Sequence, residues 1–264
     1  MTGARWPALV LATLVAAAIA APIVAPYAPD QLDLAHRRDR PSHEHWFGTD
    51  ELGRDVLARV LYGARVSLAV GLLSAAVAGA SGTAIGGIAG YAGGSLDNIL
   101  MRGTDAMLAV PRLPLLMIAA AVFQPTVPQL VLLIGLASWM ETARVARAEL
   151  LSLRTRDFVG AARALGAGHA RLILAHLLPN AAPAVTVSMT LAVGRSILLE
   201  SAISFFGVGV QPPASSWGNM LYQAQSALAT EPWLALFPGL FIFATTLSVN
   251  LAGERLATAA HRNL

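Results

Sequence analysis

The feature that most constrains this chain is a series of apolar stretches separated by polar segments. A helix that crosses a bilayer needs about 20 mostly apolar residues, and the third stretch reaches that length only with its flanks. Only 12% of the 264 residues are charged, whereas soluble domains carry about a quarter. We therefore expect an all-α polytopic membrane protein with about six transmembrane helices. The stretches cover residues 8–28, 66–91, 113–123, 129–144, 181–206 and 233–251.

The placement of arginine predicts the orientation. All eighteen basic residues are Arg, and cytoplasmic loops carry more basic residues than outer loops. With the N-terminus inside, eleven fall in cytoplasmic segments, six fall in the first outer loop, and Arg195 lies in the fifth stretch. We therefore predict that both termini are cytoplasmic. The cytoplasmic set is Arg5, Arg102, Arg112, Arg144, Arg147, Arg154, Arg156, Arg163, Arg171, Arg255 and Arg262; the outer set is Arg37, Arg38, Arg40, Arg54, Arg59 and Arg65.

Missing residue types exclude several chemistries. The chain has no Cys, so it forms neither a disulfide nor a thiolate metal site. It also has no Lys, and therefore lacks the lysine that holds nucleotide phosphates in a Walker A motif. The net charge of +3 is basic, but the Arg residues lie between apolar stretches and not in a patch with aromatic residues. We predict no nucleic-acid partner, and no cofactor or metal bound by this chain.

The layout divides the chain into three parts. We predict an N-terminal transmembrane helix at 1–28 and an external segment with an interfacial helix at 29–65. The core at 66–264 then holds five transmembrane helices and a cytoplasmic loop at 150–180. Arg5 and the apolar run to residue 20 also resemble a cleavable signal peptide, which is the alternative for the first helix. Small residues along the second stretch favour close helix packing over a narrow pore lining. They are Gly71, Ala75, Gly79, Gly82, Gly86 and Gly90.

The cytoplasmic loop alternates small and basic residues and predicts two short helices. Thr155 or Asp157 can cap the first helix, and Gly166 and Gly168 can form the bend. Pro179 is expected to end the second helix before the next span. Such a surface suits docking against another protein. An amphipathic linker lying on the inner leaflet is the alternative.

The outer loop ends in a motif with a structural interpretation. Thr49 or Asp50 can cap a helix whose apolar residues recur at helical spacing. That helix would lie on the outer membrane surface, with Asp50, Arg54 and Asp55 making local ion pairs. A structural role is favoured over contact with a substrate, and contact with a partner protein outside the membrane is also open. The apolar residues are Val56, Leu57, Val60 and Leu61.

Ionisable residues inside an apolar span are costly and are functional candidates. Arg195 and Glu200 lie in the fifth stretch, and Glu200 is expected near its outer end, where water reaches it. Lining of a pathway and pairing between helices are both open for them. The polar stretch from Asp97 to Asp105 predicts a short cytoplasmic interfacial helix. Three histidines gather in the outer loop without the carboxylate spacing of a metal site, namely His36, His43 and His45.

Several segments resemble one family of transport proteins. The loop at 150–180 resembles the coupling loop of ABC importer permeases, which reads Glu-Ala-Ala, three residues, Gly, and later His-x-x-Pro. Gly160 stands where that family has Glu. The segment 45–55 is similar to the signature before the second span of dipeptide, oligopeptide and nickel permeases, and shorter matches follow at 62–68, 143–150, 200–207, 211–218 and 238–253. The matching residues are Ala161, Ala162, Gly166, His176 and Pro179 in the loop, with Asp157 just before, and Gly48, Thr49, Asp50, Gly53, Arg54 and Asp55 in the signature.

The resemblance implies a fold, partners and a role. It implies a type I ABC importer permease in a bacterial inner membrane, with both termini inside. It also implies a second homologous permease, two ABC ATPase subunits or domains that bind ATP and Mg²⁺, and an extracytoplasmic substrate-binding protein. This chain would then not be an enzyme. Di- or oligopeptides are the expected substrates, with nickel or metal chelates and glutathione as alternatives. An ion-driven secondary transporter would need inverted repeats, and a membrane enzyme would need clustered His, Asp or Glu; the sequence has neither.

Overall fold

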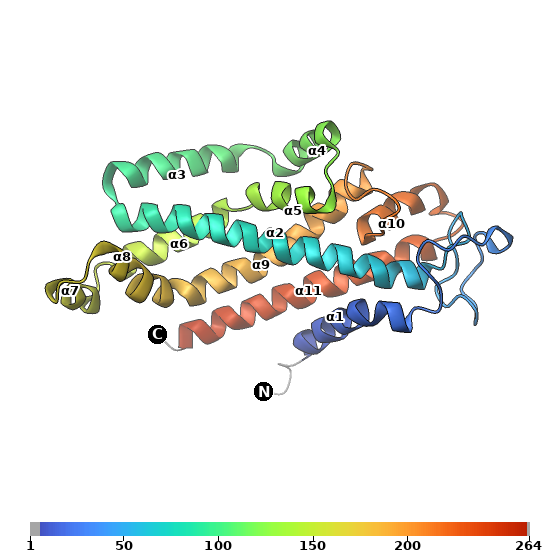
Figure 1. Ribbon diagram of the computed structural model, residues 1–264, viewed down its shortest axis with the longest axis horizontal. Helices are drawn as coiled ribbons and strands as arrows, with labels where there is room; N and C mark the ends of the chain where they lie inside the picture. The colour runs from blue at the N-terminus through green and yellow to red at the C-terminus, as the bar shows by residue number, and fades with distance from the viewer. Residues whose placement is uncertain (1–5, 263–264) are drawn as a thin grey trace.

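The computed structural model describes residues 6–262, and its regular structure there is helical apart from one isolated bridge between Thr49 and Asp55 (Figure 1). The all-α prediction is confirmed. Arg5, counted above as cytoplasmic, lies outside the described residues. The elements are α1 Trp6–Val24, η1 Leu34–His36, α2 Val56–Ala92, α3 Gly94–Ala109, α4 Arg112–Phe123, α5 Val127–Leu136, α6 Met140–Leu153, α7 Asp157–Ala164, α8 His169–Arg171, η2 Leu172–Leu177, α9 Leu178–Phe205, α10 Trp217–Ala224, η3 Gln225–Ala227 and α11 Trp233–Arg262.

Four of the predicted spans correspond to long apolar helices within the described chain. They are α1, α2, α11 and a continuous helix from His169 to Phe205 that includes α9. The third predicted span is only the second half of a bent pair, α3 and α4, whose axes differ by 79°. The fourth is divided between the short apolar α5 and α6. The count of six is therefore not confirmed: four helices are long enough alone, and five if the bent pair is one span.

The long helices lie side by side along the molecule (Figure 1). One end, the α7 end, carries α7 and α8; the opposite end, the α10 end, carries α10 and the loop at residues 25–55. α1 runs toward the α10 end, and α11 runs back toward the α7 end. The N-terminal end of α1 and the C-terminal end of α11 therefore both point toward the α7 end, as a topology with both termini inside requires.

The glycine stripe of α2 lets other helices approach its backbone. A Cβ on Gly86 would lie 2.0 Å from the carbonyl oxygen of Ala143, and one on Gly90 would lie 2.6 Å from that of Arg147. Both partners belong to α6. Toward the α10 end, a Cβ on Gly71 would meet Ile197 of α9 at 2.4 Å. Only glycine fits such contacts, so the stripe packs helices together, as the favoured interpretation predicted.

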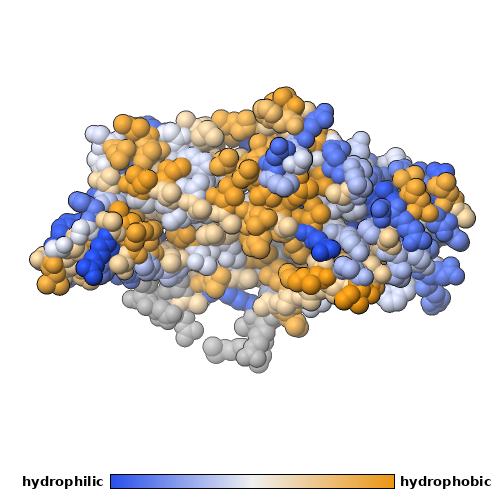
Figure 2. All heavy atoms as spheres, viewed as in Figure 1, coloured by the Kyte–Doolittle hydropathy of each residue, from blue (hydrophilic) through white to orange (hydrophobic). Residues whose placement is uncertain are grey.

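The surface matches a protein surrounded by lipid and partner chains. Figure 2 shows hydrophobic residues over the middle of one face and hydrophilic residues gathered at the α10 end. Large apolar side chains are exposed on α1 and α4, among them Ile23 at 89% and Phe123 at 75%. Soluble monomers rarely expose apolar surface on this scale.

The polar stretch from Asp97 to Asp105 forms a helix, as its sequence predicts. It belongs to α3, which packs along α2 and α6 and runs from the α7 end toward the middle of the bundle (Figure 1). Asp97 bonds Arg147 of α6 through two hydrogen bonds of 2.5 and 2.7 Å. Arg112 was predicted to lie in a cytoplasmic segment. It is the first residue of α4 and lies beyond the end of α3 at Ala109. The ion pairs to α6 hold this mostly exposed helix against the bundle.

Candidate functional site

The loop at the α7 end forms the first of the two short helices that its sequence predicts, as α7, but the second is the beginning of a long helix that continues into α9. Gly166 forms the bend with φ +84°, a conformation that L side chains rarely adopt. The N-cap of α7 is Arg156, not Thr155 or Asp157. Pro179 does not end the second helix. It lies inside the helix that is continuous from His169 to Phe205, directly after the π-helical segment η2.

One face of α7 is anchored and the other is exposed. Val159 is fully buried and packs with Leu150, Leu172 and other residues of α6, η2 and α9. On the outside, Leu165 is 90% exposed. A Cβ on Gly160 would have no heavy atom within 4 Å, so the family's glutamate would project into open space here. Of the predicted loop residues, Asp157, Ala161, Gly166 and Pro179 are exposed, and Ala162 and His176 are half-buried.

Two contacts that the sequence did not predict tie this loop to the bundle. The Tyr91 hydroxyl, at the last turn of α2, hydrogen-bonds His169 Nδ1 at 2.5 Å. Arg154, just after α6, donates from Nη1 to the carbonyl oxygen of Tyr91 at 3.2 Å. The ends of α2 and α6 are thereby joined to α8. No sequence motif marks these residues, because the contacts depend on helices that are distant in the chain.

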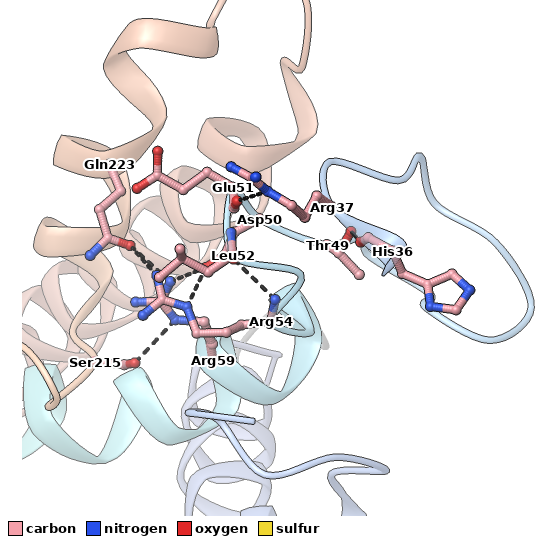
Figure 3. Close-up of polar contacts among 10 residues, drawn as sticks. All are labelled: His36, Arg37, Thr49, Asp50, Glu51, Leu52, Arg54, Arg59, Ser215 and Gln223. Atoms are coloured by element: carbon pink, nitrogen blue, oxygen red, sulfur yellow. Dashed lines mark hydrogen bonds and ion pairs between the residues drawn. The ribbon is translucent and has the colours of Figure 1, made fainter. Parts of the chain in front are cut away.

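The signature before α2 forms a buried polar network at the α10 end (Figure 3). Asp50 is 6% exposed and accepts hydrogen bonds from the backbone N–H and Nε of Arg54, at 3.0 and 2.7 Å, and from Arg59. Gln223 of α10 accepts from Arg59 at 2.8 Å and from Arg54 at 3.3 Å, and Ser215 accepts from Arg59 at 3.3 Å. The predicted ion pair between Asp50 and Arg54 is therefore present. The network fixes the outer loop to α2 and α10.

The external helix predicted after this signature is the beginning of α2 itself. Asp55, not Thr49 or Asp50, is its N-cap and accepts from the N–H of Ala58 at 2.7 Å. Asp55 also pairs with His45 at 2.9 Å and not with Arg54. Thr49 is fully buried and bonds backbone groups of the loop. These contacts favour the structural interpretation of the signature, in which its residues hold the loop in place.

Two glycines of the signature are required by geometry. Gly48 and Gly53 have φ of +75° and +73°. A Cβ on Gly53 would lie 1.7 Å from the carbonyl oxygen of Asp33. Asp33 itself bonds His36 at 2.9 Å, which raises the pKa of His36 and lowers that of Asp33. His36 therefore pairs with Asp33, and His45 pairs with Asp55, so the two histidines have separate carboxylate partners.

Glu200 does not reach water, contrary to expectation. It is fully buried in α9 and accepts hydrogen bonds from Ser204 at 2.8 Å, Ser67 at 3.0 Å and Ser201 at 3.5 Å. α10 folds back over this position. The Ser67 hydroxyl accepts the N–H of Trp217, the first residue of α10, at 3.2 Å. Glu200 therefore links α2, α9 and α10, which favours pairing between helices. Arg195 is half-buried and is not one of its partners.

A series of ion pairs between α3–α4 and α6 was also missed. Arg144 bonds Asp105 at 2.5 Å, and Arg112 bonds Glu141 at 2.6 Å, in addition to the pair of Arg147 with Asp97. The three α6 members are three residues apart and share one helix face. The sequence does not predict these pairs, because they depend on how α3 and α4 pack against α6, although Pro111 marks the break between α3 and α4.

Known proteins resemble this chain over most of its length. Residues 82–262 match the family described as the binding-protein-dependent transport system inner membrane component. A Brucella suis protein provisionally named a peptide permease is 41% identical over 95% of this chain and 84% of its own length. The oligopeptide transport system permease protein of Bacillus subtilis is 35% identical over 95% and 82%. A glutathione transport system permease protein of Escherichia coli is 37% identical over 97% and 85%.

Proposed function

This chain belongs to the family of inner membrane components of binding-protein-dependent transport systems, and we propose that it forms half of the translocation pathway of an ATP-driven peptide importer. It is a multi-pass permease of the bacterial inner membrane. The α7 end is then cytoplasmic and the α10 end faces outward. The relatives named above transport oligopeptides or glutathione, itself a short peptide. Peptides are therefore the proposed substrates, with metal chelates as the alternative.

The proposal includes partners that supply what this chain lacks. ATP and Mg²⁺ would be bound by two ABC ATPase subunits or domains, since a chain without Lys has no Walker A motif. A homologous second permease would complete the pathway. An extracytoplasmic binding protein would deliver substrate at the α10 end, where the network around Asp50 keeps the loop rigid. This chain would bind no cofactor and catalyse no reaction; it would convert ATPase motion into alternating access.

The observation that carries the proposal is the geometry of the loop at the α7 end. α7 presents an exposed face to the cytoplasm, with Leu165 and part of Phe158 uncovered. Behind it, the helix from His169 to Phe205 continues without interruption into the bundle. A displacement of α7 by an ATPase subunit would therefore move α9 directly. The π-helical segment η2 lies where this helix enters the bundle, and π-helical turns are frequent at functional sites.

Two glycine substitutions on α7 and its bend test this role. Gly166→Arg forces a side chain onto a backbone with φ +84° and should distort the bend. Gly160→Glu places a carboxylate in open space and should be tolerated. We expect Gly166→Arg to abolish ATPase stimulation by loaded binding protein in proteoliposomes, while Gly160→Glu retains it. Normal stimulation and peptide uptake with Gly166→Arg, in a complex that assembles normally, would show that coupling does not pass through this loop.

A further inference from the structure

Two helix breaks face each other within the bundle. α3 ends at Ala109 and α4 begins at Arg112 after a bend of 79°. α5 ends at Leu136 and α6 begins at Met140. An ion pair of 2.6 Å between Arg112 Nη2 and Glu141 Oε1 joins the first turns of the two helices that follow these breaks. Non-helical backbone at membrane depth occurs only where it is buried in protein or lines a water-filled cavity.

The pair lies well inside the molecule. Glu141 precedes the end of α6 at Leu153 by twelve residues, a distance of about 18 Å along a helix. The hydrocarbon core of a bilayer is about 30 Å thick. The pair therefore lies about 18 Å from the cytoplasmic end of α6, a distance of more than half this thickness. Ionisable residues within a membrane are costly and in general serve a function.

The pair is partly exposed, unlike the enclosed carboxylate of Glu200. The Arg112 and Glu141 side chains are 21% and 31% exposed. Within the described chain, Glu141 Oε2 is buried and has no hydrogen-bond partner, and the same holds for the hydroxyl of Ser138 in the adjoining break. One carboxylate oxygen of Glu141 thus has acceptor capacity that the protein itself does not use. Buried polar atoms in this condition point to a ligand or water.

An open polar groove lies between α3 and α6, next to this pair on the cytoplasmic side. Arg144 and Arg147 line it from the α6 face that also carries Glu141. A polar surface therefore leads from the Arg112–Glu141 pair toward the cytoplasm. The lining residues all belong to α3 or α6, and are Asn98, Met101, Arg102, Asp105, Arg144 and Arg147.

We propose that Arg112 and Glu141 are the recognition point for a zwitterionic peptide in this half of the pathway. The guanidinium of Arg112 binds the peptide's C-terminal carboxylate, for which its planar fork is suited. The carboxylate of Glu141 binds the N-terminal ammonium through its free Oε2. When no peptide is present, the two side chains pair with each other. This inference rests on the proposed function and specifies its substrate class: peptides with both termini free.

The energetics of exchange fit a transient site. A desolvated ion pair roughly balances the cost of removing its charges from water. Replacing the Arg112–Glu141 pair by two pairs with the peptide therefore needs little net energy, so the peptide is recognised without being trapped. The ends of an extended dipeptide are about 7 Å apart. Because Arg112 and Glu141 lie at separate helix breaks, a change in the bend between α3 and α4 would separate them enough to admit it.

The test measures which charged end of a peptide each residue recognises. The probes are dialanine, N-acetyl-dialanine and dialanine amide, at millimolar concentration. Binding is followed by thermal stabilisation of the purified, assembled complex without the binding protein. The wild-type complex should bind dialanine at least about tenfold more tightly than either blocked peptide. Glu141→Gln should remove the discrimination against acetylation alone, and Arg112→Gln that against amidation alone.

Control variants and outcomes keep the test decisive. Arg65→Gln, exposed on α2 near the α10 end, should keep the wild-type discrimination. Each comparison is made within one variant, so a general loss of stability does not alter the ratio. No binding of dialanine to the wild type, or unchanged discrimination in both variants, would overturn the inference. The proposed function fails separately, if the wild-type complex with its binding protein imports no peptide when given ATP.

Discussion

Replacing Glu200 should loosen the α10 end of the bundle by an amount set by its hydrogen bonds. Ser204 and Ser67 donate to it at 2.8 and 3.0 Å, and Ser201 is more distant at 3.5 Å. Hydrogen bonds between membrane helices contribute about 0.6 kcal/mol on average and at most about 1.7. The Ser67 bond joins α2 to α9 and the Ser204 bond lies within α9; with a similar contribution from each, Glu200→Leu should lose about 1–3 kcal/mol. Glu200→Gln keeps one acceptor oxygen and should lose about half as much.

The assay is thermal unfolding of the purified complex, followed by tryptophan fluorescence. Trp217 is fully buried and its N–H bonds Ser67, so it reports on this region. In a chain of this size, 1 kcal/mol corresponds to about 2–4 °C, and Glu200→Leu should lower the unfolding temperature by about 2–12 °C. Glu254→Gln, exposed on α11, is the control and should have almost no effect. An unchanged unfolding temperature in Glu200→Leu would refute the structural role of this carboxylate.

Two further variants test the packing and the coupling. Gly86→Ala places a Cβ 2.0 Å from the carbonyl oxygen of Ala143 and should cost about 1–3 kcal/mol, whereas Gly87→Ala, whose nearest neighbour is at 3.7 Å, should be tolerated in the same unfolding assay. Tyr91→Phe removes the hydrogen bond to His169 and should weaken ATPase stimulation by loaded binding protein. Wild-type stimulation in that variant would show that this contact does not contribute to coupling.

The sequence predicts those parts of the fold that depend on local patterns. The long helices follow from hydropathy, because a run of apolar residues is sufficient to identify α2 or α11 as able to span a membrane. The bend at Gly166 follows from residue type, because glycine adopts positive φ without a steric cost. The packing role of the stripe in α2 follows from helical spacing, and Gly86 confirms it.

The remaining features depend on contacts between distant segments. The break between α5 and α6 falls at Ala137, Ser138 and Trp139, which include neither Gly nor Pro, so no residue marks it. Glu200 lies near a helix end, where water is expected, but α10 folds back and encloses it. Arg112 meets Glu141 only because of the bend after α3. A hydropathy window averages over all of these features.

The central claim, that α7 is the contact with the ATPase, is tested most directly by cross-linking. The chain contains no Cys, so Leu165→Cys, at a position 90% exposed, introduces its single thiol. Glu44→Cys, exposed in the outer loop, is the control. A short thiol-to-amine cross-linker applied to inner membranes should join the Leu165→Cys chain, and not the Glu44→Cys chain, to an ATPase subunit. Cross-linking to the ATPase from residue 44, or its absence at residue 165 in an actively importing complex, would contradict the account.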